Sequence, residues 1–367
     1  MKSAKKRQIQ ERADAALVVR TPVAEQLLIE EIPSIGESRI LCTSLGRGQF
    51  AQMAASYTPG VQVVCHFFDT YLASQAIEHC GAGEGAPAIV CTPDLPEGPF
   101  DLVAIPIDPR GDAELTRDLL QSGHERLAMG GRLLSSTSAD DDQWLHGEMR
   151  KLFEKVTRRP MDDGVLYLAT KTAALKKHKN FDCDFAFRDH ERLIKAFSRP
   201  GVFSHRSLDG GARALINTMT VHNGDRVLDL GCGCGSVALA VAFRANAVSV
   251  IAVDSHARAV ECTARAAKMN ELENVTAILN ADGDAPKAGT FDLVLGNPPY
   301  YSDYRIGEIF LQGARRALKP GGKVLIVAKS YAWYETRMPE IFDDMKLHSH
   351  KHYTVVEATQ RAEMNGM

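Results

Sequence analysis

The tetrapeptide Asn297-Pro298-Pro299-Tyr300 combines residue types that could hold a planar amine. The asparagine side-chain oxygen and the Pro298 carbonyl can both accept N–H bonds, and Tyr300 offers a ring for stacking. Two consecutive prolines cannot continue a sheet ladder, so the apolar run 291–295 before them must end there. Held in this way, a base amine or a carboxamide would direct its nitrogen lone pair at an electrophile without a strong base. The motif therefore predicts transfer of an alkyl group to a planar amine by positioning.

A second motif is a glycine-rich loop placed where a predicted strand turns into a helix. It reads Asp229-Leu230-Gly231-Cys232-Gly233-Cys234-Gly235. The dinucleotide pattern would need its third small residue one position later, at Ser236. The acid in front of the loop suits a cationic ligand better than a pyrophosphate. We read Cys232 as a loop residue of the cofactor site and not as a zinc ligand, because no suitably spaced histidine pair accompanies it.

Two further acids follow successive predicted strands. Asp254, followed by Ser255, ends one strand and could take ribose hydroxyls, and Asp282 follows the next and could accept from an adenine amine. Ligands of parallel α/β sheets lie beyond the carboxyl ends of the strands, so these acids and the loop predict one site. A sulfonium, a ribose and an adenine without phosphate together describe S-adenosylmethionine. The sequence gives no sign of a metal.

The chain contains an internal duplication. Residues 39–51 align without gaps on 226–238, Phe100–Val103 matches Phe291–Val294, and 127–132 matches 318–323. The three offsets are 187, 191 and 191, far longer than a solenoid repeat. Each copy alternates short apolar runs with helical stretches, which is typical of a parallel sheet with crossover helices.

The expected strands and helices follow this rhythm. In the second copy the strands are 225–230, 248–253, 275–279, 291–295 and 323–327, with helices over 257–270 and 307–318 and a turn at 319–322. In the first copy the strands are 39–43, 62–68, 88–91, 102–106 and 132–136.

Composition excludes several classes of protein. The chain has 367 residues, 45% of them hydrophobic and 24% charged, with a net charge of −3. It carries no apolar run long enough to cross a bilayer, so we expect a cytoplasmic protein with no membrane contact. The eight cysteines are scattered, which indicates free thiols and not a disulfide framework. Basic stretches at 2–12 and 171–179 are expected to be a solvated terminus and linker, with phosphate contact as the alternative.

The second copy resembles the class I S-adenosylmethionine-dependent methyltransferases of the N-methylating Asn-Pro-Pro-Tyr/Phe type. With its duplication, the chain more narrowly resembles the bacterial ribosomal RNA guanine-N2 methyltransferases. That resemblance also rests on motifs on either side of the site, which are Val202-Phe203-Ser204, Leu208-Asp209-x-Gly211, Ile326-Val327-Ala328, Tyr334-Glu335 and Lys351-x-Tyr353-x-Val355-x-x-Ala358. Two positions depart from the family pattern, which usually has asparagine where Lys329 stands and phenylalanine where Tyr300 stands.

The resemblance implies a fold of two tandem Rossmann-like domains, each a mostly parallel, doubly wound sheet with helices on both faces. It implies a basic leader at 1–14, a degenerate domain at 15–175 that is structural and holds RNA, a linker at 176–200 and a catalytic, cofactor-binding domain at 201–367. It adds Asp209 to the cofactor residues and places catalysis at Asn297, Pro298, Pro299 and Tyr300, with Asn297 also contacting the cofactor. In the first copy Cys42, Ser44 and Ile105–Asp108 replace the acid, glycine and tetrad, although Asp69 remains at the second strand's end.

The expected substrate is a guanine amine of ribosomal RNA, free or in a ribosomal subunit or assembly intermediate, modified by a monomer. Two alternatives remain open. The acceptor could be a protein glutamine or an adenine amine, since enzymes for both also carry Asn-Pro-Pro-Tyr. The chain could also be a non-catalytic RNA-binding assembly factor on the same scaffold.

Overall fold

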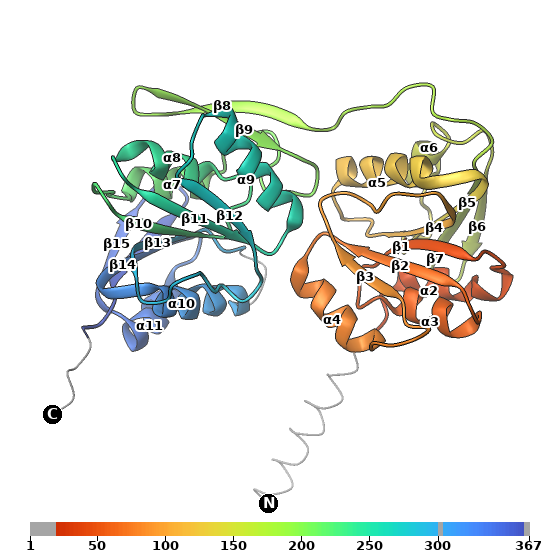
Figure 1. The fold of residues 1–367 in the computed structure, drawn as a ribbon, viewed down its shortest axis with the longest axis horizontal. Coiled ribbons are helices and arrows are strands. Elements are labelled where there is room, and N and C mark those ends of the chain that lie inside the picture. Colours follow the sequence, from red (N-terminus) through yellow and green to blue (C-terminus); the bar gives the residue numbers. More distant parts are fainter. Residues whose placement is uncertain (1–19, 300–303, 363–367) are drawn as a thin grey trace, which may run out of the picture.

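The computed structural model describes residues 20–299 and 304–362. They form two halves that lie side by side, each built on a seven-stranded sheet (Figure 1). The strand orders are β3-β2-β1-β4-β5-β7-β6 and β12-β11-β10-β13-β14-β16-β15, which are the same topology repeated. In each sheet the first five strands pair in parallel and the last two join antiparallel. The expectation of two tandem, mostly parallel doubly wound sheets is confirmed.

The N-terminal half contains seven strands, five α-helices and one short 3-10 helix within the described residues. In chain order they are α2 (Val23–Glu30), η1 (Ile32–Ser34), β1 (Arg39–Thr43), α3 (Gln49–Tyr57), β2 (Gln62–Phe67), α4 (Thr70–Cys80), β3 (Ala88–Cys91), β4 (Phe100–Ile107), α5 (Ala113–Arg126), β5 (Leu127–Thr137), α6 (Trp144–Met149), β6 (Val156–Met161) and β7 (Gly164–Thr170).

A two-stranded hairpin, β8 (Cys183–Asp189) and β9 (Arg192–Ser198), connects the halves. The C-terminal half then repeats the pattern. Its elements are α7 (Gly210–Thr218), β10 (Arg226–Leu230), α8 (Ser236–Arg244), β11 (Ser249–Asp254), α9 (Ala257–Met269), β12 (Val275–Leu279), β13 (Phe291–Gly296), α10 (Arg305–Ala317), β14 (Leu318–Ala328), α11 (Ala332–Ile341), β15 (Asp343–Ser349) and β16 (Thr354–Thr359).

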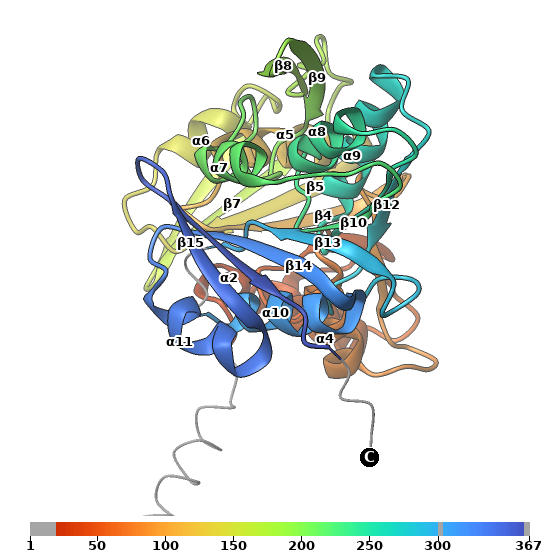
Figure 2. The ribbon, with the colours of Figure 1, turned by 90° about the vertical axis from the view of Figure 1, so that its left-hand side faces the viewer.

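Each sheet is covered by three helices on one face and two on the other. In the C-terminal half, α7, α8 and α9 lie on one face of the sheet and α10 and α11 on the other (Figure 2). Side chains of the first three helices contribute to one core and those of the other two to a second core. In the N-terminal half, α2, α3 and α4 share one core and α5 and α6 the other. Burial on both faces explains why the parallel strands read as continuous apolar runs in the sequence.

The expected strands match the observed ones within a residue or two at most ends, but the turn expected at 319–322 is wrong. Those residues lie inside β14, which begins at Leu318. The register with β13 shifts between Phe291, which pairs with Leu318, and Leu293, which pairs with Lys323. The Pro-Gly-Gly sequence is therefore accommodated as a bulge in a continuing strand and does not separate two elements. The N-terminal half repeats this irregularity between β4 and β5.

The expected linker at 176–200 is not simply a linker. Its hairpin packs Phe187, Ile194 and Phe197 into the core formed by α7, α8 and α9. Lys171, expected in a solvated run, is buried, and its Nζ donates to the Leu127 carbonyl at 2.7 Å. Burial lowers the pKa of this lysine. Charge runs usually lie in solvent, so only the fold could place this lysine inside.

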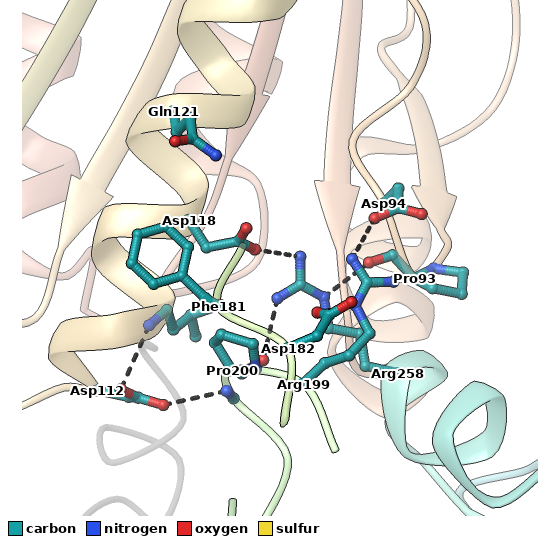
Figure 3. A network of polar contacts seen from close by, with 12 residues as sticks. Pro93, Asp94, Asp112, Asp118, Gln121, Phe181, Asp182, Arg199, Pro200 and Arg258 are labelled. Carbon is teal, nitrogen blue, oxygen red and sulfur yellow. Dashed lines mark hydrogen bonds and ion pairs between the residues drawn. The ribbon is translucent and has the colours of Figure 1, made fainter. Parts of the chain in front are cut away.

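The two halves are joined by a polar network around Arg258 of α9 (Figure 3). This side chain is 1% exposed and crosses into the N-terminal half. It donates to the Pro93 carbonyl at 2.8 Å, to Asp118 at 2.6 Å and, within its own half, to the Pro200 carbonyl at 3.0 Å. Beside it, Arg199 bonds Asp94 of the N-terminal half and Glu261 of α9. A buried, multiply bonded arginine of this kind fixes the geometry between the halves.

The eight cysteines all lie in the described part of the chain and are free thiols, buried or half-buried. No helix among the described residues is long and apolar enough to span a membrane.

Candidate functional site

The glycine-rich loop after β10 is built from three left-handed residues. Gly231, Gly233 and Gly235 have φ of 70°, 55° and 80°, a region that other residues seldom adopt. A Cβ on Gly231 would lie 2.7 Å from the Phe310 ring. A Cβ on Gly233 would meet nothing closer than the Phe203 carbonyl oxygen at 3.9 Å, so this glycine borders open space. The loop therefore leaves room for a ligand to approach its backbone closely.

Asp229, which ends the loop's strand, is buried beneath it. Its Oδ2 accepts from the amide of Ala238 in α8 at 3.0 Å. Burial raises the pKa of this carboxyl to about 7, and the nearby Asp254 contributes in the same direction. A buried carboxylate that is costly to ionise favours a cationic ligand, because the cation would stabilise the charged form.

Asp254 ends β11, and its carboxylate ties the loop to the next turn. Oδ2 accepts from the Gly233 amide at 2.9 Å, and Oδ1 accepts from the His256 amide at 2.8 Å. Removal from water raises the pKa of Asp254 to about 6. Ser255 follows, but its hydroxyl donates to Asp69 of the N-terminal half at 2.6 Å.

Asp282 lies apart from these groups in the structure. Its side chain is exposed, its backbone amide donates to Asn280 at 2.8 Å, and its carbonyl accepts from Arg316 at 2.9 Å. It follows β12, which is the outer strand of the sheet next to β11. Its position at that strand end is as expected, but it does not line the cavity described below.

Asn297 follows β13 at the neighbouring strand end, and Asp209 fixes its orientation. The Asn297 Nδ2 donates to Asp209 Oδ2 at 2.9 Å, and the same oxygen accepts from the amides of Gly211 and Ala212 as the N-cap of α7. A carboxylate oxygen only accepts, so the nitrogen side of the amide must face it. The Asn297 Oδ1 is thereby turned to the other side, as the acceptor of the pair.

Close packing brings this strand end against the glycine loop. A Cβ on Gly296 would lie 2.8 Å from both Ile326 and Phe310, the same ring that lies against Gly231. The Phe310 ring of α10 therefore packs against both motifs. Pro298 and Pro299 continue from Asn297, whereas Tyr300 lies outside the described residues.

A cavity of about 370 Å³, including the part open to solvent, joins the two motifs. It is lined by Phe203, Ser204, Asp209, Ala212, Asp229, Gly231, Cys232, Gly233, Cys234, Ser236, Val237 and Asn297. Of the residues that the sequence singled out, Asp209, Asp229, Gly231, Cys232, Gly233 and Asn297 meet here. Gly235, Asp254, Ser255, Asp282, Pro298 and Pro299 do not line it.

Sequence reasoning missed two features of this cavity. The first is the Asp209–Asn297 hydrogen bond, since the sequence suggested Asp209 only as a cofactor contact. The second is Phe203, which lines the cavity and yet keeps 57% of its surface exposed. Its place in the segment Val202–Ser204 was noted, but nothing local indicated that this ring would stand over the glycine loop.

In the N-terminal half, a buried side chain of the protein itself binds the corresponding loop. Glu25 of α2 is fully buried, and its carboxylate accepts from the Ser44 hydroxyl at 2.7 Å and from the Phe50 amide at 3.0 Å. Burial raises the pKa of this carboxyl. Asp69, expected at the second strand's end, instead caps α4 and bonds Ser255. The donors that would meet a ligand in this copy are thus satisfied by the protein itself.

A larger cavity, of about 1410 Å³ including the part open to solvent, contains none of the predicted site residues. It lies between the β8–β9 hairpin and the C-terminal ends of α7 and α8, beside Arg192, Arg213 and Arg244. Arg244 is already held by both oxygens of Asp189, and Arg192 lies over the Phe243 ring. The predicted site residues that line a cavity therefore line the smaller one. Among the described residues no group of three metal-ligating side chains gathers.

The fold and the site together define a class I methyltransferase scaffold. Residues 194–357 match the family model described as the methyltransferase small domain. The match includes the glycine loop, the strand-end acids and Asn-Pro-Pro-Tyr.

Proteins named as ribosomal RNA methyltransferases are among the relatives of this chain. Ribosomal RNA small subunit methyltransferase C of Pseudoalteromonas translucida is 34% identical over 171 residues, covering 46% of this chain and 48% of that protein. Ribosomal RNA large subunit methyltransferase G of Ectopseudomonas mendocina is 28% identical over 305 residues, covering 80% of each. The alignments with several small-subunit relatives span only about half of their length.

One solved structure shares the fold over nearly the whole chain. The 16S rRNA N2 methyltransferase of T. thermophilus, in complex with AdoMet and guanosine, aligns with a TM-score of 0.76 at 22% identity, over 93% of this chain and 92% of that one. The comparisons confirm the resemblance to ribosomal RNA methyltransferases with two tandem domains.

Proposed function

We propose that this protein is an S-adenosylmethionine-dependent N-methyltransferase that modifies the exocyclic N2 amine of a guanine in ribosomal RNA. The observation that carries the proposal is the Asn297 amide, whose nitrogen is bound to Asp209 in the cavity that also contains the glycine loop. An amide oxygen can only accept hydrogen bonds, and we assign this oxygen to a substrate amine. A guanine amine presents two N–H donors, which is the complement of an amide oxygen and a backbone carbonyl.

The cofactor would be held by the loop and the acids around it. We assign the buried Asp229 and the backbone at Gly231, Cys232 and Gly233 to the cationic end, because this region combines a carboxylate with open backbone. Asp254 is assigned to the ribose, with Gly235 needed for the turn into α8. Two groups fit less closely, since Asp282 is exposed and outside the cavity and Ser255 is engaged by Asp69. We keep both as contacts at the rim of the adenosine.

S-adenosylmethionine supplies, when bound, a methyl group on a sulfonium that is open to attack. The residues of the chain act by positioning the substrate amine. Asn297 Oδ1 and the Pro298 carbonyl accept the two N–H bonds of the substrate amine, which holds its lone pair toward the methyl donor. Pro299 stiffens this segment, and we assign the stacking of the base to Tyr300. The amine becomes cationic as it is alkylated and then loses its proton to water, so no strong base is required.

The substrate class draws on the relatives, which are named for ribosomal RNA of either subunit. We propose ribosomal RNA, alone or in a subunit or assembly intermediate, as the partner of a cytoplasmic, monomeric enzyme. The target base would have to leave its stack to reach the cavity. We further propose that the N-terminal half, from about residue 15 to 175, is non-catalytic, since Cys42 and Ser44 replace the acid and glycine and Glu25 fills the loop.

The test is methyl transfer from labelled cofactor to deproteinised ribosomal RNA and to each isolated ribosomal subunit, followed by nucleoside digestion. Label in N2-methylguanosine is expected. Label in methyladenosine or in protein would instead support the adenine or glutamine alternative. Failure to bind the cofactor would support a non-catalytic assembly factor.

The matched variant is Asn297→Ala, compared with Asn223→Ala, which changes the same residue type in the segment before β10, outside the cavity. Asn297→Ala should leave cofactor affinity nearly unchanged and lower turnover by about 10²-fold, as the loss of one preorganised hydrogen-bonding group does elsewhere. A loss of less than about threefold would show that the amide does not hold the acceptor.

A further inference from the structure

The turn that follows Asp254 is held by the N-terminal half. The Thr70 amide donates to the Ser255 carbonyl at 2.8 Å, and the Ala257 amide donates to the Phe68 carbonyl at 2.7 Å. Asp69 and His256 form an isolated antiparallel bridge between these two bonds. The Phe68 and His256 rings stack with 5.5 Å between centroids. Residues 255–257 thus lie against residues 68–70 as two short facing strands.

The Asp69 carboxylate adds a side-chain contact to this backbone pairing. One oxygen caps α4 by accepting from the amides of Tyr71 at 2.9 Å and Leu72 at 3.0 Å. The other accepts from the Ser255 hydroxyl at 2.6 Å. Because its first oxygen is anchored to a helix, this carboxylate is a rigid acceptor for Ser255.

The turn held in this way carries the Asp254 carboxylate. Asp254 directly precedes Ser255. One of its carboxylate oxygens accepts a hydrogen bond from the amide of His256, in the same turn. Its other oxygen binds Gly233 of the glycine loop. Displacement of Ser255 and His256 would therefore shift Asp254 relative to the loop.

The contact joins equivalent positions of the two copies. The aligned offset of 187 makes Phe68 and Asp69 the counterparts of Ser255 and His256, and the strand registers agree, since Cys42 pairs with Cys65 and Asp229 with Ala252. The counterpart of Asp254 in the first copy is Phe67, which is buried and cannot serve as an acceptor. The first copy thus has no acid at the position of Asp254, and its next two residues contact the second copy.

We propose that Asp69 is a positioning residue for the cofactor site of the C-terminal half, acting through Ser255 on the turn that presents Asp254. The inference rests on the proposed function in taking that site to bind S-adenosylmethionine. It gives the N-terminal half a direct part in cofactor binding, separate from any contact with RNA.

Asp112 provides a matched control within the same interface. It caps α5 with one oxygen, through the amides of Glu114 and Leu115, and its other oxygen accepts across the interface from the Gly201 amide at 3.1 Å. Figure 3 shows this contact beside the Arg258 network. Asp112→Ala therefore removes a helix cap and a cross-interface bond, as Asp69→Ala does, but none of these bonds involves the turn 254–256.

The experiment measures the dissociation constant of S-adenosylmethionine by calorimetry for the wild type, Asp69→Ala, Asp69→Asn and Asp112→Ala. Asp69→Ala should weaken binding about tenfold, the effect expected when one charge-assisted hydrogen bond positions a ligand group. In Asp69→Asn the side-chain oxygen can keep the α4 cap while the amide nitrogen donates to the Ser255 hydroxyl oxygen, so binding should stay within about threefold of the wild type. With RNA as acceptor, Asp69→Ala should raise KM for the cofactor and leave kcat nearly unchanged.

Amide hydrogen exchange of the ligand-free protein supplies a readout that does not depend on the cofactor. The Gly233 and His256 amides, which donate to Asp254, should exchange faster in Asp69→Ala than in Asp112→Ala. If the wild type binds no cofactor, the proposed function fails while this comparison still decides the role of Asp69. Ser255→Ala removes the same hydrogen bond from the other side, and it should accelerate the same amides if Asp69→Ala does not fold.

An unchanged affinity and unchanged exchange in Asp69→Ala would overturn the proposal. Equal losses in Asp69→Ala and Asp112→Ala would overturn it too, because they would show a general loosening of the interface.

Discussion

Replacing Arg258 with alanine tests how strongly the two halves depend on each other. The guanidinium is 1% exposed and makes hydrogen bonds to Pro93, Pro200 and Asp118, and its carbon lies 4.3 Å from the Phe68 ring centroid. The change removes all of these contacts, empties the space of the side chain and leaves Asp118 without its buried partner.

The expected loss is about 4 kcal/mol of the free energy of unfolding, because breaking a buried ion pair from one side costs about 3–5 kcal/mol. Arg244→Ala is the matched control. Arg244 also makes three hydrogen bonds, two to Asp189 and one to the Met219 carbonyl, but all of its partners lie on the C-terminal side of the interface. The two substitutions should lower the free energy of unfolding by similar amounts. Only Arg258→Ala removes hydrogen bonds between the two halves.

The assay is urea unfolding followed by fluorescence in single-tryptophan variants. The chain has two tryptophans, Trp144 in α6 of the N-terminal half and Trp333 in α11 of the C-terminal half. In the parent protein both reporters should unfold in one transition. Arg258→Ala should lower both midpoints and separate them, whereas Arg244→Ala should lower them together or affect Trp333 alone. A loss below about 1 kcal/mol for Arg258→Ala, or no separation of the two transitions, would refute the reasoning.

Three further predictions concern the site and its counterpart in the N-terminal half. Asp209→Ala should lower kcat at saturating cofactor by about tenfold, because it removes the hydrogen bond that orients the Asn297 amide; an unchanged kcat would contradict this orientation. Folding raises the pKa of Asp229 to about 7 and that of Asp254 to about 6, so their contribution to stability is complete below about pH 4 and is lost as the pH rises through these values. A cationic cofactor favours both ionised carboxylates, so calorimetry between about pH 5.5 and 8 should show tighter binding at higher pH with release of protons, and a flat profile would exclude this linkage. Glu25→Ala should cost about 2 kcal/mol in urea unfolding by leaving buried donors unsatisfied, with cofactor affinity unchanged; weakened binding would show that the loop beside Glu25 also takes part in cofactor binding.

Local patterns were sufficient to predict the architecture. Short apolar runs separated by helical stretches predicted strands such as β1 and β12 with the observed bounds. In β1 the three central residues are buried, as expected of a strand covered on both faces, whereas β12 is an outer strand that is only partly buried. The errors occurred where tertiary contacts override local signals. The Pro-Gly-Gly at 320–322 would ordinarily end an element, yet pairing with β13 carries β14 through it as a bulge. Likewise the hairpin at 183–198 is stabilised by its packing against the C-terminal core and not by a strong signal of its own.

Local sequence motifs were enough to predict the proposed chemistry. The glycine spacing, the strand-end acids and Asn-Pro-Pro-Tyr are contiguous motifs, and the rule that parallel strands present their carboxyl ends at one edge brings them together. Only the tertiary structure decided which of these groups touch. Asp209 orients Asn297 from 88 residues away, and Asp69 binds Ser255 across 186 residues. Such contacts depend on how helices and sheets pack in three dimensions, and no periodicity or spacing along the chain encodes them.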